Sequence, residues 1–313
     1  MTLPPTRRRH AGPDATRSPA LAGLPSRRAV LAGLPSRRAV LAGAMATGGA
    51  LALSRAQAAP ASRLIDDRWT RFGGGGDTDN AAWARFLMAY LVPGGAGGVA
   101  LVDYGAAVAD RSALQGYIDQ LQRVEPTTLG RDAAFAYWVN LYNAVTILLV
   151  LDAYPVDSIR EVRGGLFNTG PWGDEVVRVE GQDLSLDDIE HGILRPVWRD
   201  PRIHYAVNCA SIGCPDLAAE PYTATRLETM LDAGARAYAA HPRGADARDG
   251  EITVSKIYDW FAEDFGEGDE RSVLDHLATY APPGKAAQLA AAQGIDAYAY
   301  DWSLNRVGWR GDT

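Results

Sequence analysis

The spacing of apolar residues predicts helices over much of the first half of the chain. Helical periodicity covers residues 82–92 and 110–124, with a stop at Pro93 and Gly94 between them. The strongest helical pattern covers residues 132–153, where apolar side chains occupy nearly every face. A helix that is apolar all round is buried, so we expect this segment to lie at the centre of the fold.

The second half of the chain predicts shorter elements. Apolar residues alternate with polar ones around Gly181, which predicts a hairpin over residues 175–186. Ser185 suits the start of a short helix that ends near Pro196, and the apolar run 203–207 predicts a buried strand. The other expected elements are a helix over 225–240 opened by a capping box of Thr225 and Glu228, a strand over 252–254, helices over 256–265 and 271–280, and a closing strand over 297–304. Helices interrupted by a few short strands are typical of an α+β domain, here mostly helical, with a small mixed or antiparallel sheet.

Residues 1–58 have the parts of an export signal in the right order. A twin-arginine pattern, Arg37-Arg38, precedes a weakly apolar run of about 15 residues, shorter than the roughly 20 needed to span a bilayer. An A-x-A motif then predicts cleavage after Ala58, and a tandem repeat over residues 21–40 duplicates the twin arginine. We therefore expect twin-arginine export to the periplasm or the extracellular space, with an ordinary secretory signal as the alternative.

The charge balance of the chain changes once this segment is set aside. Nine arginines and one aspartate lie in residues 1–58, so the remainder has 22 basic and 37 acidic residues and a net charge of −15. So acidic a surface repels phosphate backbones, which argues against a nucleic-acid partner. We expect residues 59–313 to form one globular domain without a membrane span, since they are numerous enough for one core and contain no Ser/Pro-rich linker.

Histidine and cysteine residues gather in one window of the sequence. Both cysteines of the chain, Cys209 and Cys214, closely follow His204, and His191 lies upstream beside Glu190. A thiolate nucleophile needs an imidazole or helix N-terminus that lowers its pKa and a polar group that fixes the imidazole. Cys209 follows the expected strand and precedes small residues, where free backbone amides are expected to hold an oxyanion. Cys209 is therefore our candidate nucleophile.

His191 is the preferred general base among the candidates. His204 lies five residues before Cys209 along the expected strand, and strand side chains alternate between faces, so His204 is expected to point away. Glu190 also belongs to the candidate set, but it points about 100° away from its neighbour His191 on a helix and orients that ring poorly.

Asn140 and Asn143 are the polar exceptions on the expected central helix. They lie three residues apart on one face, and buried amides cost about 1 to 3 kcal/mol each when left unpaired. One interpretation is that they fix a neighbouring loop. The other is that one of them orients the catalytic imidazole or donates to an oxyanion, with the Cys209 loop or the His191 helix as its partner.

Three other interpretations of the cysteines stay open. Two cysteines spaced C-x4-C in an exported protein often form a structural disulfide, and they can also form a redox-active pair. The spacing H-x12-H-x4-C-x4-C offers His191, His204, Cys209 and Cys214 as four ligands for zinc, although the usual C-x2-C clamp is missing.

Several longer stretches resemble a known family. They are AYWVNLYNAVTI (136–147), LSLDDIEHGILRP (184–196), RIHYAVNCASIGCPDL (202–217), EPYTATRLETMLDAGARA (220–237), SKIYDWFAEDF (255–265) and YDWSLN (300–305). In this order they are similar to the domain-of-unknown-function family numbered 547, over about residues 132–305. The resemblance implies no particular reaction and no catalytic residues. A papain-like fold is an analogy from the Asn-Cys pair and the imidazoles alone.

These observations favour an exported α+β enzyme of the thiol hydrolase or acyl transferase type. Cys209 is the expected nucleophile, His191 the base, and Asn143 or Asn140 the orienter or oxyanion donor, acting on an acyl or peptide-type bond. No cofactor is required by this hypothesis, and zinc belongs only to the alternative. The competing hypothesis is a non-catalytic binding or scaffold domain with a Cys209–Cys214 disulfide.

Overall fold

The computed structural model describes residues 60–163 and 170–310. These residues belong to one compact unit, Arg55–Thr313. The expected export signal, with Arg37, Arg38 and the cleavage site after Ala58, lies outside the described residues.

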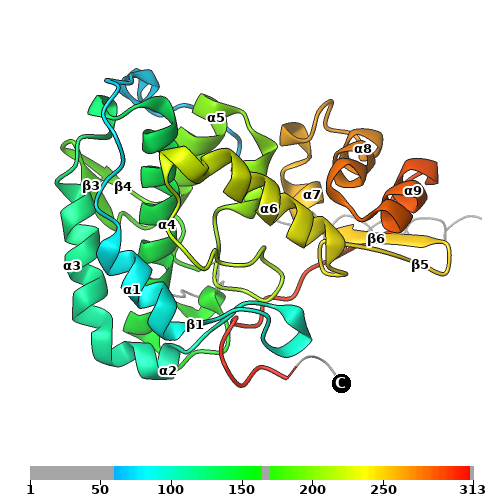
Figure 1. Cartoon of the computed structure of the whole chain (residues 1–313), viewed down its shortest axis with the longest axis horizontal. Coiled ribbons are helices and arrows are strands. Elements are labelled where there is room, and N and C mark those ends of the chain that lie inside the picture. The colour runs from blue at the N-terminus through cyan, green and yellow to red at the C-terminus, as the bar shows by residue number, and fades with distance from the viewer. Residues whose placement is uncertain (1–59, 164–169, 311–313) are drawn as a thin grey trace, which may run out of the picture. The chain divides into compact units, whose positions relative to one another are not determined.

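Helices dominate the described residues and the strands are short, as Figure 1 shows. The α-helices are α1 (Ala81–Tyr90), α2 (Tyr104–Ala107), α3 (Arg111–Gln122), α4 (Arg131–Ala153), α5 (Arg195–Trp198), α6 (Leu227–Ala240), α7 (Ile257–Trp260), α8 (Glu270–Tyr280) and α9 (Pro283–Ala291). The strands are β1 (Leu91–Val92), β2 (Leu101–Val102), β3 (Val177–Val179), β4 (Gln182–Leu184), β5 (Ala245–Arg248), β6 (Glu251–Ser255) and β7 (Ala297–Ala299). This confirms the predicted α+β class with small sheets.

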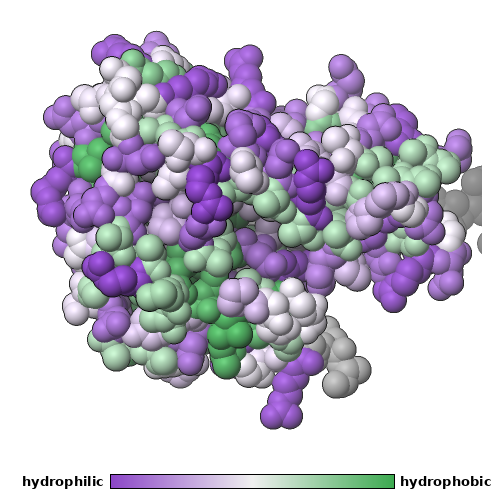
Figure 2. All heavy atoms as spheres, in the orientation of Figure 1, coloured by the Kyte–Doolittle hydropathy of each residue, from purple (hydrophilic) through white to green (hydrophobic). Residues whose placement is uncertain are grey.

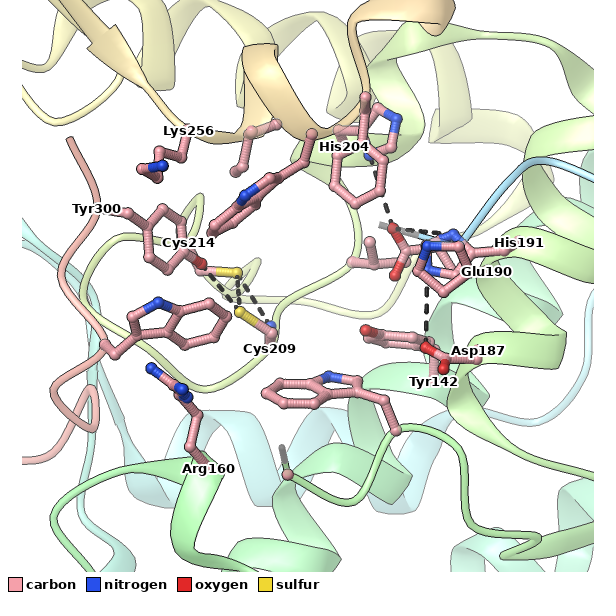
Figure 3. A pocket seen from close by; sticks show the side chains of 18 of the residues that line it. Tyr142, Arg160, Asp187, Glu190, His191, His204, Cys209, Cys214, Lys256 and Tyr300 are labelled. Atoms are coloured by element: carbon pink, nitrogen blue, oxygen red, sulfur yellow. Dashed lines mark hydrogen bonds and ion pairs between the residues drawn. The ribbon is translucent and has the colours of Figure 1, made fainter. Parts of the chain in front are cut away.

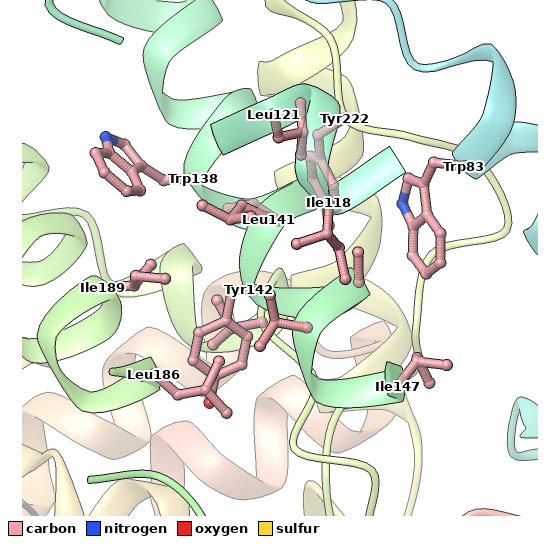
Figure 4. Packing of buried hydrophobic residues seen from close by; sticks show 14 of the residues in the cluster. Trp83, Ile118, Leu121, Trp138, Leu141, Tyr142, Ile147, Leu186, Ile189 and Tyr222 are labelled. Atoms are coloured by element: carbon pink, nitrogen blue, oxygen red, sulfur yellow. The ribbon is translucent and has the colours of Figure 1, made fainter. Parts of the chain in front are cut away.

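The long helix α4 lies at the centre of the larger hydrophobic core. Every residue from Ala133 to Leu151 is buried, and Figure 4 shows Trp138, Leu141 and Tyr142 packing among side chains of neighbouring elements. The predicted central helix is confirmed. By length and composition α4 is also apolar enough to cross a membrane, but its apolar window is wholly buried inside the unit, which is typical of a core helix.

A second hydrophobic core forms around the three-stranded sheet. Strand β6 pairs antiparallel with β5 and parallel with β7, and α6, α8 and α9 pack around this cluster. The predicted helix over 225–240 is present as α6, but the capping box is wrong. Thr225 lies inside a short 3-10 helix, η8 (Ala224–Arg226), and its hydroxyl reaches only the Thr223 hydroxyl.

The β3–β4 hairpin leads into the helix that carries the acidic and imidazole residues. Its turn places Glu180 and Gly181 at positive φ, which fits a tight two-residue hairpin turn. Ser185 then donates to the Asp188 carboxylate and accepts from the Asp188 backbone nitrogen. The helix that follows is a π-helix, η6 (Asp188–Leu194), rather than the regular helix predicted. Such turns occur often at functional sites.

Residues 203–207 do not form the predicted strand. A 3-10 helix, η7 (Pro201–Tyr205), begins after Asp200, whose side chain caps it. Proline in the first turn and an aspartate cap favour a helical start, and they outweigh the apolar run. The argument that strand alternation separates His204 from Cys209 therefore fails.

Hydrophilic and apolar residues are mixed on the surface. Figure 2 shows a face that is hydrophilic over much of its outline and has an apolar area near the middle. Among the described residues the exposed large hydrophobic side chains are Ile65, Met88, Val92, Val108 and Val307. A pocket between several elements is described below.

Candidate active site

A pocket of about 700 Å³ contains most of the polar residues that the sequence indicated. Residues of α4, η6, α7, the loop after η7 and the stretch after β7 line it, so elements far apart in sequence meet there. Figure 3 shows one side with Cys209, Cys214, Tyr300 and Lys256, and an opposite side of carboxylates and imidazoles. Small-molecule sites usually have roughly 300 to 1,000 Å³, so the pocket has the size of such a site.

The sulfur of Cys209 is surrounded by three hydrogen-bonding groups. Cys214 Sγ lies at 2.7 Å, the Tyr300 hydroxyl at 3.1 Å and the Ser211 hydroxyl at 3.2 Å. The backbone nitrogen of Cys209 donates to Cys214 Sγ at 3.0 Å. Both cysteines are free thiols, since their sulfurs are farther apart than the about 2.05 Å of a disulfide bond.

These neighbours favour the ionised form of Cys209. Burial raises the pKa of a thiol, but hydrogen bonds from Cys214, Ser211 and Tyr300 outweigh it and hold the pKa of Cys209 below its ordinary value. Burial and the adjacent Cys209 raise the pKa of Cys214 well above its ordinary value. Burial and the two sulfurs also raise the pKa of Tyr300, which therefore keeps its proton for donation. The site therefore favours ionisation of Cys209 over ionisation of Cys214 and Tyr300.

Neighbouring side chains fix the loop that carries the thiols. The Asn208 side chain accepts from the Ala210 nitrogen and donates to the Pro215 carbonyl, which closes the loop around both cysteines. Ala210 has a φ of 59°, a left-handed conformation that costs a non-glycine residue about 1 kcal/mol or more. Gly213 is required, because a Cβ there would lie 2.9 Å from the Tyr300 ring. The loop is thus shaped to hold Tyr300 against the sulfurs.

The backbone amides of this loop are already in use. The nitrogens of residues 212–214 donate to carbonyls within the protein, and those of Cys209 and Ala210 donate to Cys214 Sγ and Asn208. The expectation that free amides follow Cys209 and hold an oxyanion is therefore wrong for these five nitrogens.

Asn143 and Asn140 hold two different loops. The Asn143 side chain accepts from the Asn208 nitrogen at 2.8 Å and donates to the Ala206 carbonyl at 2.9 Å, which confirms that an amide of the central helix meets the Cys209 loop. Asn140 instead pairs with both backbone groups of Tyr222. Neither amide lines the pocket, and their partners are backbone groups and not an imidazole. The expected roles of ring orienter and oxyanion donor are therefore not supported.

His204 lies between two carboxylates. Its Nε2 is 2.7 Å from Asp264 Oδ2, its Nδ1 is 3.6 Å from Glu190 Oε1, and its ring stacks on Phe261. Burial alone would lower the pKa of His204, but hydrogen bonds to these two carboxylates raise it. Burial would raise the pKa of both acids. Nearby imidazoles nevertheless lower the pKa of Glu190 to about 2. Hydrogen bonds from His204 and Arg195 lower the pKa of Asp264 to about 2. The two carboxylates therefore favour the protonated form of His204 and occupy its ring, which makes it a poor candidate for a free base.

His191 and Asp187 form a second pair, in which burial favours the neutral form of each side chain. His191 Nε2 is 3.6 Å from Asp187 Oδ1, and the Arg195 guanidinium is 3.3 Å from His191 Nδ1. Burial lowers the pKa of His191, although the negative charge of Glu190 acts in the opposite direction. Burial and the charges of Glu190 and Asp188 raise the pKa of Asp187 to about 6. An imidazole and a carboxyl group perturbed in this way suit general acid–base catalysis.

The structure brings His191 and Cys209 into one pocket without a hydrogen bond between them. The polar partners of the Cys209 sulfur are Cys214, Ser211 and Tyr300, and Figure 3 shows His191 on the opposite side of the pocket. Ionisation of Cys209 therefore depends on donors at the sulfur and not on a neighbouring imidazole.

The four residues of the zinc alternative do not converge. The nitrogens of His204 face carboxylates, whereas the sulfurs of Cys209 and Cys214 face each other. Within residues 60–163 and 170–310, no group of three or more His, Cys, Asp or Glu side chains is arranged to hold a metal ion. The proposed set with His191 is thus divided between two sides of the pocket.

Several residues of the pocket were not identified from the sequence. Tyr300 and Ser211 contact the Cys209 sulfur, and Asp264 completes the carboxylate group. Lys256 lines the pocket and has no hydrogen bond or ion pair from its side chain within the described part of the chain. The aromatic lining consists of Tyr142, Trp172, Trp260, Phe261, Tyr300 and Trp302. The only sequence feature that pointed to several of them was their position in the stretches that resemble the family.

Residues 126–239 match the model of a family described as protein of unknown function, DUF547. Over these residues the chain is similar to that family. The DUF547 segment contains α4, η6, η7 and the cysteine loop, and Lys256, Asp264 and Tyr300 lie beyond it. No curated protein and no solved structure matches the chain significantly. The resemblance seen in the sequence is confirmed, and the papain-like analogy gains no support from a known fold.

Proposed function

We propose that the chain is a thiol-dependent hydrolase or acyl transferase in which Cys209 attacks an acyl or amide-type carbonyl. One observation supports this proposal above the others. The Cys209 sulfur borders a pocket of small-molecule size and has three hydrogen-bonding neighbours that lower its pKa despite burial. A non-catalytic binding domain has no need of a stabilised thiolate.

In the proposed reaction the thiolate adds to the carbonyl carbon and expels an amine or alcohol, whose nitrogen or oxygen takes a proton from water as the bond to carbon breaks. The resulting thioester is then attacked by water or another acceptor, whose proton passes to His191, and the acid or acyl product departs as the Cys209 thiolate is restored. His191 thus acts as a base on the second nucleophile rather than on Cys209. The Asp187 carboxyl group, 3.6 Å from its ring, holds that imidazole.

The oxyanion of this reaction needs a donor other than the loop amides. Lys256 lines the pocket on the thiol side, and its side chain makes no ion pair within the described residues. We assign it the stabilisation of the developing negative charge. The indoles of Trp172, Trp260 and Trp302 favour a substrate with a flat or apolar portion.

Acyl labelling tests the proposal. Purified reduced protein is incubated with p-nitrophenyl acetate, and released nitrophenolate and the acetylated residue are measured. We expect about one acetyl group per chain, located on Cys209 and lost with time, and no such label in Cys209→Ser. Labelling that is unchanged in Cys209→Ser would leave a binding domain as the better account.

We also propose twin-arginine export to the periplasm or the extracellular space. The pattern at Arg37-Arg38 and its duplicate at Arg27-Arg28 supports it. Replacing all four arginines by lysine should retain the precursor in the cytoplasm, as seen by fractionation. Normal export of that variant would favour the ordinary secretory signal.

A further inference from the structure

Cys209 and Cys214 are placed so that a disulfide forms between them with little movement. Their sulfurs are 2.7 Å apart, and the Cys209 backbone nitrogen donates to Cys214 Sγ. The left-handed Ala210 and the hydrogen bonds of Asn208 turn the chain so that the two side chains meet. A bond of about 2.05 Å requires an approach of less than an ångström.

The two thiols differ in access in the way that disulfide exchange requires. Both cysteines line the pocket, but Cys209 is partly exposed, whereas Cys214 is buried. An incoming disulfide therefore meets Cys209 first, and Cys214 is positioned to attack only after Cys209 has reacted. The stabilised thiolate at Cys209 and the retained proton at Cys214 agree with this order.

The hydroxyl groups around Cys209 are directed at its sulfur, and the paired nitrogens of the loop are not free for a substrate oxygen. The Tyr300 and Ser211 hydroxyls lie within 3.2 Å of Cys209 Sγ, and five backbone nitrogens of the loop donate within the protein. Disulfide exchange develops charge on sulfur atoms and needs no oxyanion hole. The loop therefore suits a sulfur electrophile at least as well as a carbonyl.

We propose that Cys209 and Cys214 form a redox-active dithiol that reduces small organic disulfides bound in the pocket. The Cys209 thiolate attacks one sulfur of the substrate disulfide, and the other half leaves as a thiolate that takes a proton from water. Cys214 then attacks Cys209 Sγ, its proton passes to the second departing thiolate, and a Cys209–Cys214 disulfide forms. The substrate disulfide is the oxidant and gains two electrons, and a second dithiol must reduce the pair for another turnover.

This proposal rests on the thiolate of the proposed function and not on its acyl chemistry. Reduced wild-type protein is mixed with oxidised glutathione and followed by mass spectrometry. We expect the wild type to lose two hydrogen atoms and to carry no lasting adduct. Cys214→Ser should keep one glutathione on Cys209, resolved about 100-fold more slowly, and Cys209→Ser should remain unmodified at the same glutathione concentration. Dithiothreitol should return the native wild type to two free thiols.

Two results would overturn the redox proposal. One is a persistent glutathione adduct in the wild type, which means that Cys214 does not resolve it. The other is a wild-type disulfide that native protein does not release to dithiothreitol, which makes the pair structural. Acetylation by p-nitrophenyl acetate is measured in a separate experiment. Acetylation of Cys209 without disulfide exchange removes only the redox proposal, and exchange without acetylation removes only the acyl proposal.

Discussion

The side-chain oxygen of Asn143, on the central helix α4, accepts a 2.8 Å hydrogen bond from the backbone nitrogen of Asn208, the residue before Cys209. The same amide donates to the Ala206 carbonyl. A buried side chain thereby fixes the backbone next to Cys209 without lining the pocket itself.

Replacing Asn143 by Leu should slow alkylation of Cys209 by more than its effect on stability explains. The substitution keeps much of the volume but leaves two buried backbone groups unpaired, at about 1 to 3 kcal/mol each. Asn140→Leu is the matched control, because Asn140 makes the same two bonds to Tyr222 on the same helix. We expect similar losses in urea unfolding for both variants and a change in iodoacetamide reactivity only for Asn143→Leu. Equal reactivities would remove Asn143 from any functional role.

Tyr300→Phe should raise the pKa of Cys209. Burial already opposes ionisation of this thiol, and the variant removes one of three donors to the sulfur while keeping the ring. A hydrogen bond to a charged group is worth about 1.5 kcal/mol, so alkylation near pH 7 should fall about tenfold and recover at higher pH. Tyr298→Phe, on β7, is the control and should leave the pH dependence of Cys209 alkylation unchanged. A profile in Tyr300→Phe that matches the wild type would refute the role of the phenol.

His191→Gln should separate acid–base catalysis from activation of the thiol. His191 makes no hydrogen bond to Cys209, so alkylation near pH 7 should stay within about twofold of the wild type. Turnover of an acyl probe should fall by about 100-fold or more, which is typical for loss of a general base. Strongly slowed alkylation would instead restore the sequence-based hypothesis that His191 deprotonates Cys209.

Asp187→Asn should stabilise the protein at neutral and alkaline pH. Burial and neighbouring acids raise the pKa of Asp187 from 3.8 to about 6, so the folded state holds this proton more tightly than the unfolded state does. Ionisation therefore costs stability above about pH 6, and the cost disappears below about pH 4. Allowing for partial exposure, we expect a gain of about 1 to 2 kcal/mol near pH 8 and none near pH 4, measured by urea unfolding. Asp183→Asn, at an exposed position of strand β4, serves as the control. A stability gain that is the same at pH 4 and pH 8 would contradict the raised pKa of Asp187.

The central helix and its amides were predictable because both follow from burial. An apolar run on every face specifies a core helix, and polar groups within it need partners, which led to the expected contact between Asn143 and the Cys209 loop. Pattern reasoning failed at residues 203–207, where five residues are too few to show a period and the Asp200 cap with Pro201 decides the conformation.

The chemistry of the pocket was less accessible from sequence. Tyr300 and Asp264 lie 91 and 60 residues from the side chains they contact, Cys209 and His204, and only tertiary packing brings them together. The π-helical turn of η6 has no pattern that separates it from a regular helix, so the contacts of Glu190 and His191 could not be derived. The sequence indicated the cysteines, histidines and Glu190 of the pocket, but not which side chains each of them contacts.

The central claim is that Cys209 is ionised more readily than an ordinary thiol and more readily than Cys214. The most direct measurement is the rate of iodoacetamide alkylation of each cysteine as a function of pH, resolved by peptide mass spectrometry on reduced native protein. Because three groups donate to its sulfur, we expect Cys209 to react first, and the pH midpoint of its alkylation rate to lie below that of free cysteine. Cys214 should stay unmodified until higher pH. A midpoint for Cys209 at or above that of free cysteine, or earlier reaction of Cys214, would contradict the account.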